Sequence, residues 1–170
     1  MNRYVIFGAM LAAGVLMAGT AEVTSVQAAS NGPAASGHAR QVDLVLVTRD
    51  TSNTEIDLGQ PGFSAGDQQL FTSDVIRDGH RAGTAAGVAQ IVATTAKTLT
   101  GQVTTTMVLP EGTLTAQLAF TEILADGPPA ALYAAVTGGT GIYRDARGQC
   151  VSRAIAGGNE SRLTCQLTLG

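Results

Sequence analysis

The sequence predicts an all-β domain, either a closed antiparallel barrel or a sandwich, and three observations support this prediction. From residue 42 onward, apolar and polar residues alternate with a period of two, as they do along half-buried strands. Turn sequences such as Asp78-Gly79 and Pro110-Glu111-Gly112 interrupt the alternation at short intervals. Downstream of residue 42, no stretch combines helical periodicity with helix-capping residues. Short alternating strands in a chain of this length favour a barrel or a sandwich.

The first 28 residues are typical of an export signal. Met1-Asn2-Arg3 provides a short positive start, and the 16 residues from 4 to 19 are uncharged and apolar. This run is shorter than the roughly 20 residues that a membrane-spanning helix needs. Val26-Gln27-Ala28 places small residues at the two positions that a signal peptidase reads. We therefore expect cleavage after Ala28, secretion, and no membrane attachment of the mature protein.

The mature chain suits one domain that buries its own core. Residues 29–41 are small and polar and lack periodicity, so we expect a flexible linker before a domain at 42–170. The formal net charge is -3, and the chain has a single lysine, Lys97, with no basic run. It therefore lacks the positive surface of a nucleic-acid-binding protein.

Eight strands are expected along this domain. The clearest is 99–109, where apolar residues occupy one face and threonines the other; 112–124 repeats the pattern. Only one of these faces can line the interior, and an apolar face that points outward requires a partner chain. The expected strands are 42–49, 70–76, 81–95, 99–109, 112–124, 131–137, 146–156 and 161–169.

The two cysteines lie in the last two expected strands, and an exported protein meets oxidising conditions. A two-residue turn at Gly157-Gly158 places Cys150 directly opposite Cys165, and also sets Arg153 against Arg162. We predict a disulfide across this hairpin. A one-step shift of the turn, or two buried reduced thiols, is the alternative.

Four segments together resemble the dirigent and allene oxide cyclase superfamily, over about residues 42–169. They are GDQQLF (66–71), AGTAAG (82–87), EGTLTAQ (111–117) and AVTGGTGIYRDARG (135–148). The resemblance implies an eight-stranded antiparallel β-barrel with an apolar central cavity, commonly assembled as a trimer. It also implies that the glycines of the last segment make a tight connection at the barrel rim, and that Arg147 reaches toward the cavity mouth.

The sequence also contains partial matches to nucleotide-binding, hydrolase and metal-site patterns, and none of them has the surrounding sequence that its pattern requires. The glycines from 138 to 141 resemble a dinucleotide-binding turn, but Arg144 occupies the third glycine position and too little chain follows for a βαβ unit. GFSAG (62–66) matches a nucleophile elbow, yet no helix follows Ser64. His38 and His80 have no metal-ligand spacing. We expect no metal and no cofactor.

Glu122 is the leading candidate for acid–base chemistry. It lies on the same face of its strand as Leu118 and Phe120, because alternate residues of a strand point to one side. If that face lines the cavity, burial raises the pKa of the Glu122 carboxyl group toward neutrality. The alternative places Glu122 at an exposed strand end or on an outer face. Asp74 is a weaker candidate, because it shares a strand face with the apolar residues Leu70 and Ile76.

Arg147, supported by the matched segment, is a second candidate catalytic residue, with a rim salt bridge as its alternative role. Tyr133 and Tyr143 can donate hydrogen bonds to a ligand or pack at the rim.

The cavity wall departs from the dirigent pattern. Where plant members carry an aspartate after the GGTG turn and tyrosines in the third strand, this chain has Ile142, Ala89 and Ile91. An apolar ligand is therefore favoured over a phenolic one. The predicted ligand contacts are Ala89, Ile91, Leu118, Phe120 and Tyr133, with Glu122 and Arg147 near the mouth.

Three functions remain open. The barrel can be a cyclase or isomerase that acts by orienting a reactive apolar substrate. It can be a binding protein without turnover. It can also be a secreted interaction module whose interior is filled by side chains.

Overall fold

The computed structural model describes residues 39–155 and 159–170. The predicted signal sequence, most of the predicted linker and the Gly157-Gly158 turn lie outside these residues. β1 begins at Arg40, two residues before the predicted start of the domain. No helix in the described part of the chain is long and apolar enough to cross a membrane.

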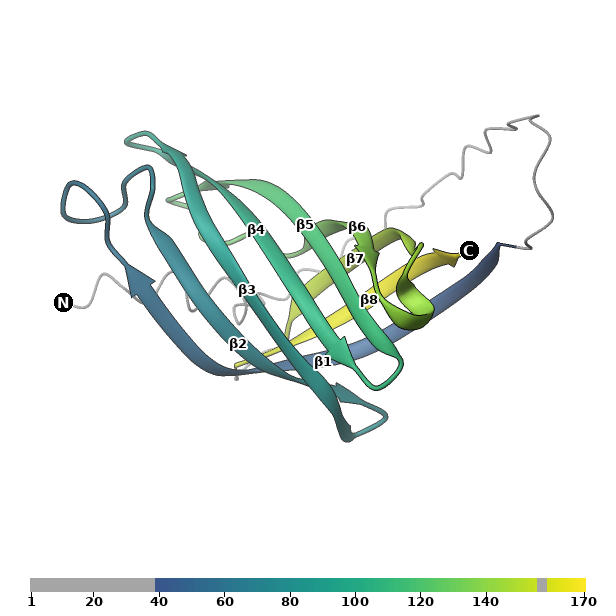
Figure 1. Cartoon of the computed structure of the whole chain (residues 1–170). Coiled ribbons are helices and arrows are strands. Elements are labelled where there is room, and N and C mark those ends of the chain that lie inside the picture. The colour runs from purple at the N-terminus through teal and green to yellow at the C-terminus, as the bar shows by residue number, and fades with distance from the viewer. Residues whose placement is uncertain (1–38, 156–158) are drawn as a thin grey trace, which may run out of the picture.

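Eight antiparallel strands close into one barrel in chain order, and β8 returns beside β1 to complete the ring (Figure 1). The predicted all-β, eight-stranded antiparallel barrel is confirmed, and the sandwich is excluded. A 3-10 turn, η1 (Gly141–Tyr143), is the one helical segment of the described residues. The strands are β1 (Arg40–Ile56), β2 (Gln68–Arg77), β3 (His80–Thr94), β4 (Thr98–Leu109), β5 (Gly112–Ile123), β6 (Leu132–Gly139), β7 (Arg147–Ala154) and β8 (Glu160–Leu169).

The apolar faces of β4 and β5 point into the barrel. Leu99 and Met107 on β4 and Leu114 on β5 are almost completely buried, and they alternate with threonines that point outward. Burial of this face supplies the hydrophobic stabilisation of the fold. Of the two orientations that the sequence left open, the structure therefore has the apolar faces of β4 and β5 inside the barrel.

The glycine-rich connection after β6 packs backbone against backbone. A Cβ atom on Gly139 would clash with the carbonyl oxygen of Thr113, and one on Gly141 would clash with that of Glu111. Gly141 also has a φ of +60°, in the left-handed region that favours glycine. The amide of Thr140 donates to the Thr113 carbonyl at 2.9 Å. These glycines let the connection close against the β4–β5 turn at the barrel rim.

The predicted cysteine register is confirmed. Cys150 on β7 lies opposite Cys165 on β8, Arg153 lies opposite Arg162, and the two cysteines form a disulfide. Both cysteines are buried. The bond therefore ties the last two strands together on the inner side of the barrel.

Candidate functional site

An internal cavity of about 100 Å³ lies inside the barrel. All eight strands contribute to its wall. A space of this size holds about seven to ten water molecules, or a compact molecule with roughly ten or slightly more non-hydrogen atoms. The lining residues are Thr48, Gln69, Phe71, Ser73, Ala85, Ala89, Val103, Thr105, Met107, Ala116, Leu118, Phe120, Leu132, Ala134, Cys150, Ser152 and Leu163.

Small inward-facing side chains keep this space open. Ala85 and Ala89 on β3, Ala116 on β5 and Ala134 on β6 all line the cavity where larger side chains would fill it. An eight-stranded barrel is just wide enough either to be filled by side chains or to hold one small ligand. The observed interior matches the second case, so the filled interaction module is disfavoured.

Most polar side chains of the wall come from one side. Gln69 and Ser73 lie on the inward face of β2, about 13 Å apart along the strand, with Phe71 between them. Gln69 and Ser73 are each only 3% exposed. The hydroxyl of Thr48 donates to the Ser161 carbonyl at 3.5 Å, and that of Thr105 to the Ala86 carbonyl at 3.4 Å.

Asp50 on β1 lies opposite Ser73 on β2. The Ser73 hydroxyl donates to the Asp50 carboxylate at 2.9 Å. Burial raises the pKa of Asp50, and the hydrogen bond from Ser73 offsets part of that rise. The β1–β2 register shifts between Asp50 and Ser52, which marks a bulge, a feature that commonly redirects side chains near sites. Asp50 is thus one hydrogen bond away from the cavity.

Glu122 continues the inward face of β5 beyond Phe120. Its residue is 2% exposed, and its Oε2 atom has no hydrogen-bond partner among the described residues. Its cross-strand neighbour is Leu99, which clusters with Ile91 and Phe120. Burial raises the pKa of Glu122. Of the two placements that the sequence left open for Glu122, the structure has the buried one, and the role of this side chain in chemistry stays a prediction.

The loop between β1 and β2 closes the barrel end that carries Glu122. The Gly66 amide donates to the Ile91 carbonyl and the Ile91 amide to the Asp67 carbonyl, each at 2.9 Å. The side chain of Phe63 packs against the apolar cluster around Ile91. This loop therefore covers one end of the interior.

Asp67 organises that loop. Its carboxylate accepts hydrogen bonds from the Leu58 amide at 2.8 Å and the Ser64 amide at 2.7 Å, and the Ser64 hydroxyl lies 2.9 Å away. Burial pushes the pKa of Asp67 up, but these hydrogen bonds outweigh it and the pKa is lowered. Ser64 also contacts the Leu58 carbonyl at 2.7 Å. The GFSAG segment is thus a loop braced by its serine and aspartate.

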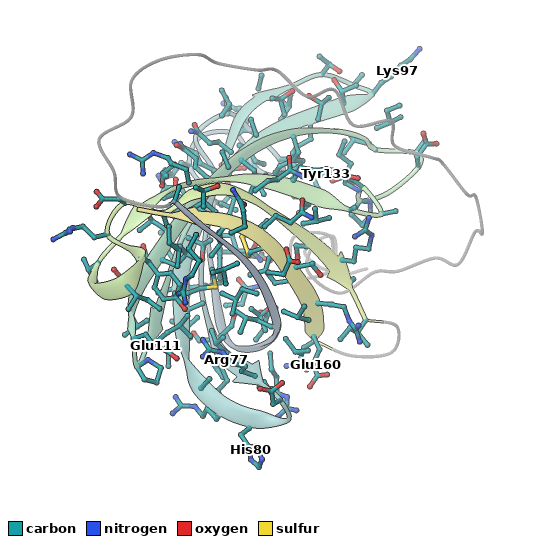
Figure 2. The ribbon with its side chains drawn as sticks, turned by 90° about the vertical axis from the view of Figure 1, so that its right-hand side faces the viewer. Arg77, His80, Lys97, Glu111, Tyr133 and Glu160 are labelled. Atoms are coloured by element: carbon teal, nitrogen blue, oxygen red, sulfur yellow. A yellow bond between two sulfur atoms is a disulfide. The ribbon has the colours of Figure 1, made fainter. Side chains whose placement is uncertain are left out.

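An ion pair occupies the opposite end of the barrel. Figure 2 shows Arg77 and Glu111 close together toward the end that carries His80, away from Lys97. The Arg77 guanidinium lies 2.6 Å from the Glu111 carboxylate. This hydrogen bond lowers the pKa of Glu111.

The structure brings only some of the predicted site residues together. Ala89, Leu118 and Phe120 line the cavity, while Ile91 is fully buried in the cluster at its end. Tyr133 is 59% exposed and is not part of the wall.

Two charged candidates also lie away from the cavity. Arg147 is exposed and donates to the Ala146 carbonyl at 2.7 Å, so the structure does not bring it to the cavity. Asp74 lies on the face of β2 that carries the exposed Leu70, and it pairs with Arg81 at 2.6 Å. The prediction that Asp74 lies on an inward face together with Leu70 was wrong, because that face of β2 points outward. In the described residues, no group of three or more His, Cys, Asp or Glu side chains is placed to hold a metal ion.

Sequence reasoning missed Asp50, Gln69 and Ser73. The available signal was the other parity of β2, where Gln69, Phe71, Ser73 and Val75 share a face. That face mixes polar and apolar residues, whereas Leu70 and Ile76 suggested the opposite face as the core.

The chain matches the family described as allene oxide cyclase barrel like domain over residues 45–166. Among solved structures it is similar to pyocyanin demethylase, with 25% identity, a TM-score of 0.63, and coverage of 75% of this chain and 100% of that one. A pterocarpan synthase dirigent protein shares 14% identity with a TM-score of 0.59, over 79% of this chain and 86% of that chain. A Diels-Alderase from Streptomyces koyangensis shares 18% identity with a TM-score of 0.56, over 79% of this chain and 69% of that chain. No curated protein sequence matches the chain.

Proposed function

We propose that this chain, which belongs to the allene oxide cyclase barrel-like family, binds one small, largely apolar molecule inside its barrel and directs the cyclisation, isomerisation or stereochemistry of that molecule. The observation that carries this proposal is the internal cavity, whose wall is mostly apolar and comes from every strand. The family match and the neighbouring pyocyanin demethylase support a small-molecule ligand.

Orientation is the main catalytic effect that such a site offers. A closed apolar wall holds a flexible molecule in one conformation and excludes water, which lowers the entropic part of the barrier. Glu122 is the proposed general acid or base, because its raised pKa keeps a protonated fraction available nearer neutral pH. A second acidic group, Asp50, can exchange a proton with the cavity through the Ser73 hydroxyl.

Binding without turnover is the second candidate function. It is favoured by the placement of the charged groups, since Arg147 lies outside the cavity and Glu122 and Asp50 lie at its margins rather than in its wall. Product formation separates the two functions.

A matched pair of variants on β6 tests ligand binding. Ala134 lines the cavity, whereas its neighbour Ala135 is exposed on the outer face. Calorimetry with 1-tetralone, a fused bicycle with one ketone, should show binding to the wild type and to Ala135→Leu. Ala134→Leu should weaken this binding at least tenfold while keeping the strand content seen by circular dichroism. No binding of 1-tetralone to folded wild type, or equal loss in both variants, would contradict an internal site.

Export is also part of the proposal. The disulfide is consistent with an oxidising compartment outside the cytosol, and the segment up to Ala28 has the features of an export signal. Intact mass of protein recovered from culture fluid should correspond to a chain that begins at Ala29. A secreted chain that retains residues 1–28 would contradict this processing.

We further infer that copies of the chain associate, as a trimer, through the outer faces of β3, β4 and β5. The outward positions of these strands carry no charged side chain from Thr84 to Val92, from Thr98 to Val108, or from Thr113 to Ile123. Depletion of charge is a feature of interface cores. Exposed Val92, Val108 and Ile123 add apolar surface to this face.

A further inference from the structure

The carboxamide of Gln69 is a buried polar group without a partner in the wall of the cavity. Gln69 is 3% exposed, and its Nε2 atom has no hydrogen-bond partner among the residues that the structure describes. A buried donor that makes no hydrogen bond costs about 1–3 kcal/mol of stability. An apolar side chain of similar size would avoid this cost, so the fold itself does not require an amide here.

No neighbour of Gln69 in the described part of the chain satisfies its amide nitrogen. Its partner on β1 is Glu55, an exposed residue whose carboxylate accepts no hydrogen bond from Gln69 Nε2. Its partner on β3 is Ala89, and the nearest inward-facing residue on its own strand is Phe71. Across the cavity the wall is formed by side chains such as Leu118, Leu132 and Ala134. None of these carries a hydrogen-bond acceptor in its side chain.

Three of the four other polar side chains of the wall are already engaged. The Ser73 hydroxyl donates to Asp50, and the hydroxyls of Thr48 and Thr105 donate to backbone carbonyls. The fourth, Ser152 on β7, is half-buried, so Gln69 carries the more deeply buried unused donor among the residues that line the cavity.

We propose that Gln69 determines the specificity of the cavity: its Nε2 donates a hydrogen bond to an acceptor atom, a ketone oxygen or a ring nitrogen, at one edge of an otherwise apolar ligand. This inference rests on the proposed function, and it narrows the ligand to a compact, largely apolar molecule with one acceptor edge. The remainder of the ligand contacts the apolar wall formed by residues such as Leu118 and Leu132. Discrimination arises because a hydrocarbon of the same shape leaves the amide unpartnered, whereas an acceptor satisfies it.

The first test uses no ligand. Gln69→Met keeps the length of the side chain and removes the amide, so it should raise the midpoint of thermal unfolding by a few degrees. Gln149→Met is the control, since Gln149 is exposed on the outer face of β7, away from the proposed interface, and it should leave the midpoint unchanged. A lower midpoint for Gln69→Met would show that the amide stabilises the fold, and would overturn the inference.

The second test compares two probes of nearly the same shape, 1-tetralone and its hydrocarbon analogue tetralin, by calorimetry. In Gln69→Met, the preference for the ketone over the hydrocarbon should fall about three- to tenfold, while tetralin binding is kept or improved. Gln149→Met should show the wild-type preference. An unchanged ratio, with both probes bound, overturns the role of Gln69 and leaves the proposed function intact. Failure of both probes to bind folded wild type overturns the proposed function, and this inference with it.

Discussion

Reduction of the Cys150–Cys165 disulfide should lower the free energy of unfolding by about 3 kcal/mol. The bond joins residues 15 apart in sequence across neighbouring strands. For a loop of about this length, the entropy lost by the cross-linked unfolded chain corresponds to about 3 kcal/mol at 25 °C. Reduction removes that constraint and leaves the folded barrel with two buried sulfur atoms in nearly the same positions.

Urea unfolding with and without a phosphine reductant measures this difference. The reduced protein should unfold at lower urea, with a steeper dependence on urea because its unfolded chain is more expanded. Cys150→Ala/Cys165→Ala is the control, since the reductant should not affect it, and the loss of two buried side chains should make it less stable than the reduced wild type. Equal midpoints for oxidised and reduced wild type, or two free thiols in unreduced denatured protein, would refute the reasoning.

Three further predictions concern the carboxyl groups and the outer face. Burial raises the pKa of Glu122 in the folded protein, so its stabilising contribution is full below the ordinary carboxyl pKa and is lost as pH rises through the folded pKa. Glu122→Gln should therefore match the thermal stability of wild type near pH 4 and exceed it at pH 8. A difference in stability that does not depend on pH would contradict burial of the charge. The pKa of Asp67 is lowered in the folded protein, so its stabilising contribution is present above the ordinary carboxyl pKa and is lost as pH falls through the folded pKa. In urea unfolding, Asp67→Ala should lower the free energy of unfolding by about 3 kcal/mol at pH 7 and by less at pH 3. Thr104→Arg on β4 should give a monomer by light scattering while Gln149→Arg on the outer face of β7 keeps the oligomer, and a wild-type monomer at micromolar concentration would refute association.

The sequence by itself determined the number of strands and separated the two faces of β4 and β5, and the structure decided that the apolar faces point inward. Alternation is a local property, because successive side chains on any strand point to opposite sides, and these strands separate leucines from threonines cleanly. The pairing of Cys150 with Cys165 was also accessible, since a glycine turn centred between two strands sets their register. The shared parity of Glu122 and Phe120 was visible in the sequence, and the structure decided that this face is buried.

Only the tertiary structure decided which residues meet in the cavity. On β2 both faces mix polar and apolar side chains, so parity alone favoured Asp74 over Gln69 and Ser73, and closure of the barrel turned the second pair inward. The Asp50–Ser73 contact depends on a bulge and on the register between β1 and β2. The open space depends on small residues from separate strands, such as Ala85 and Ala134, bordering the same cavity. Which residues border it is set by strand tilt and stagger around the closed ring, which are properties of all eight strands together and of no single segment.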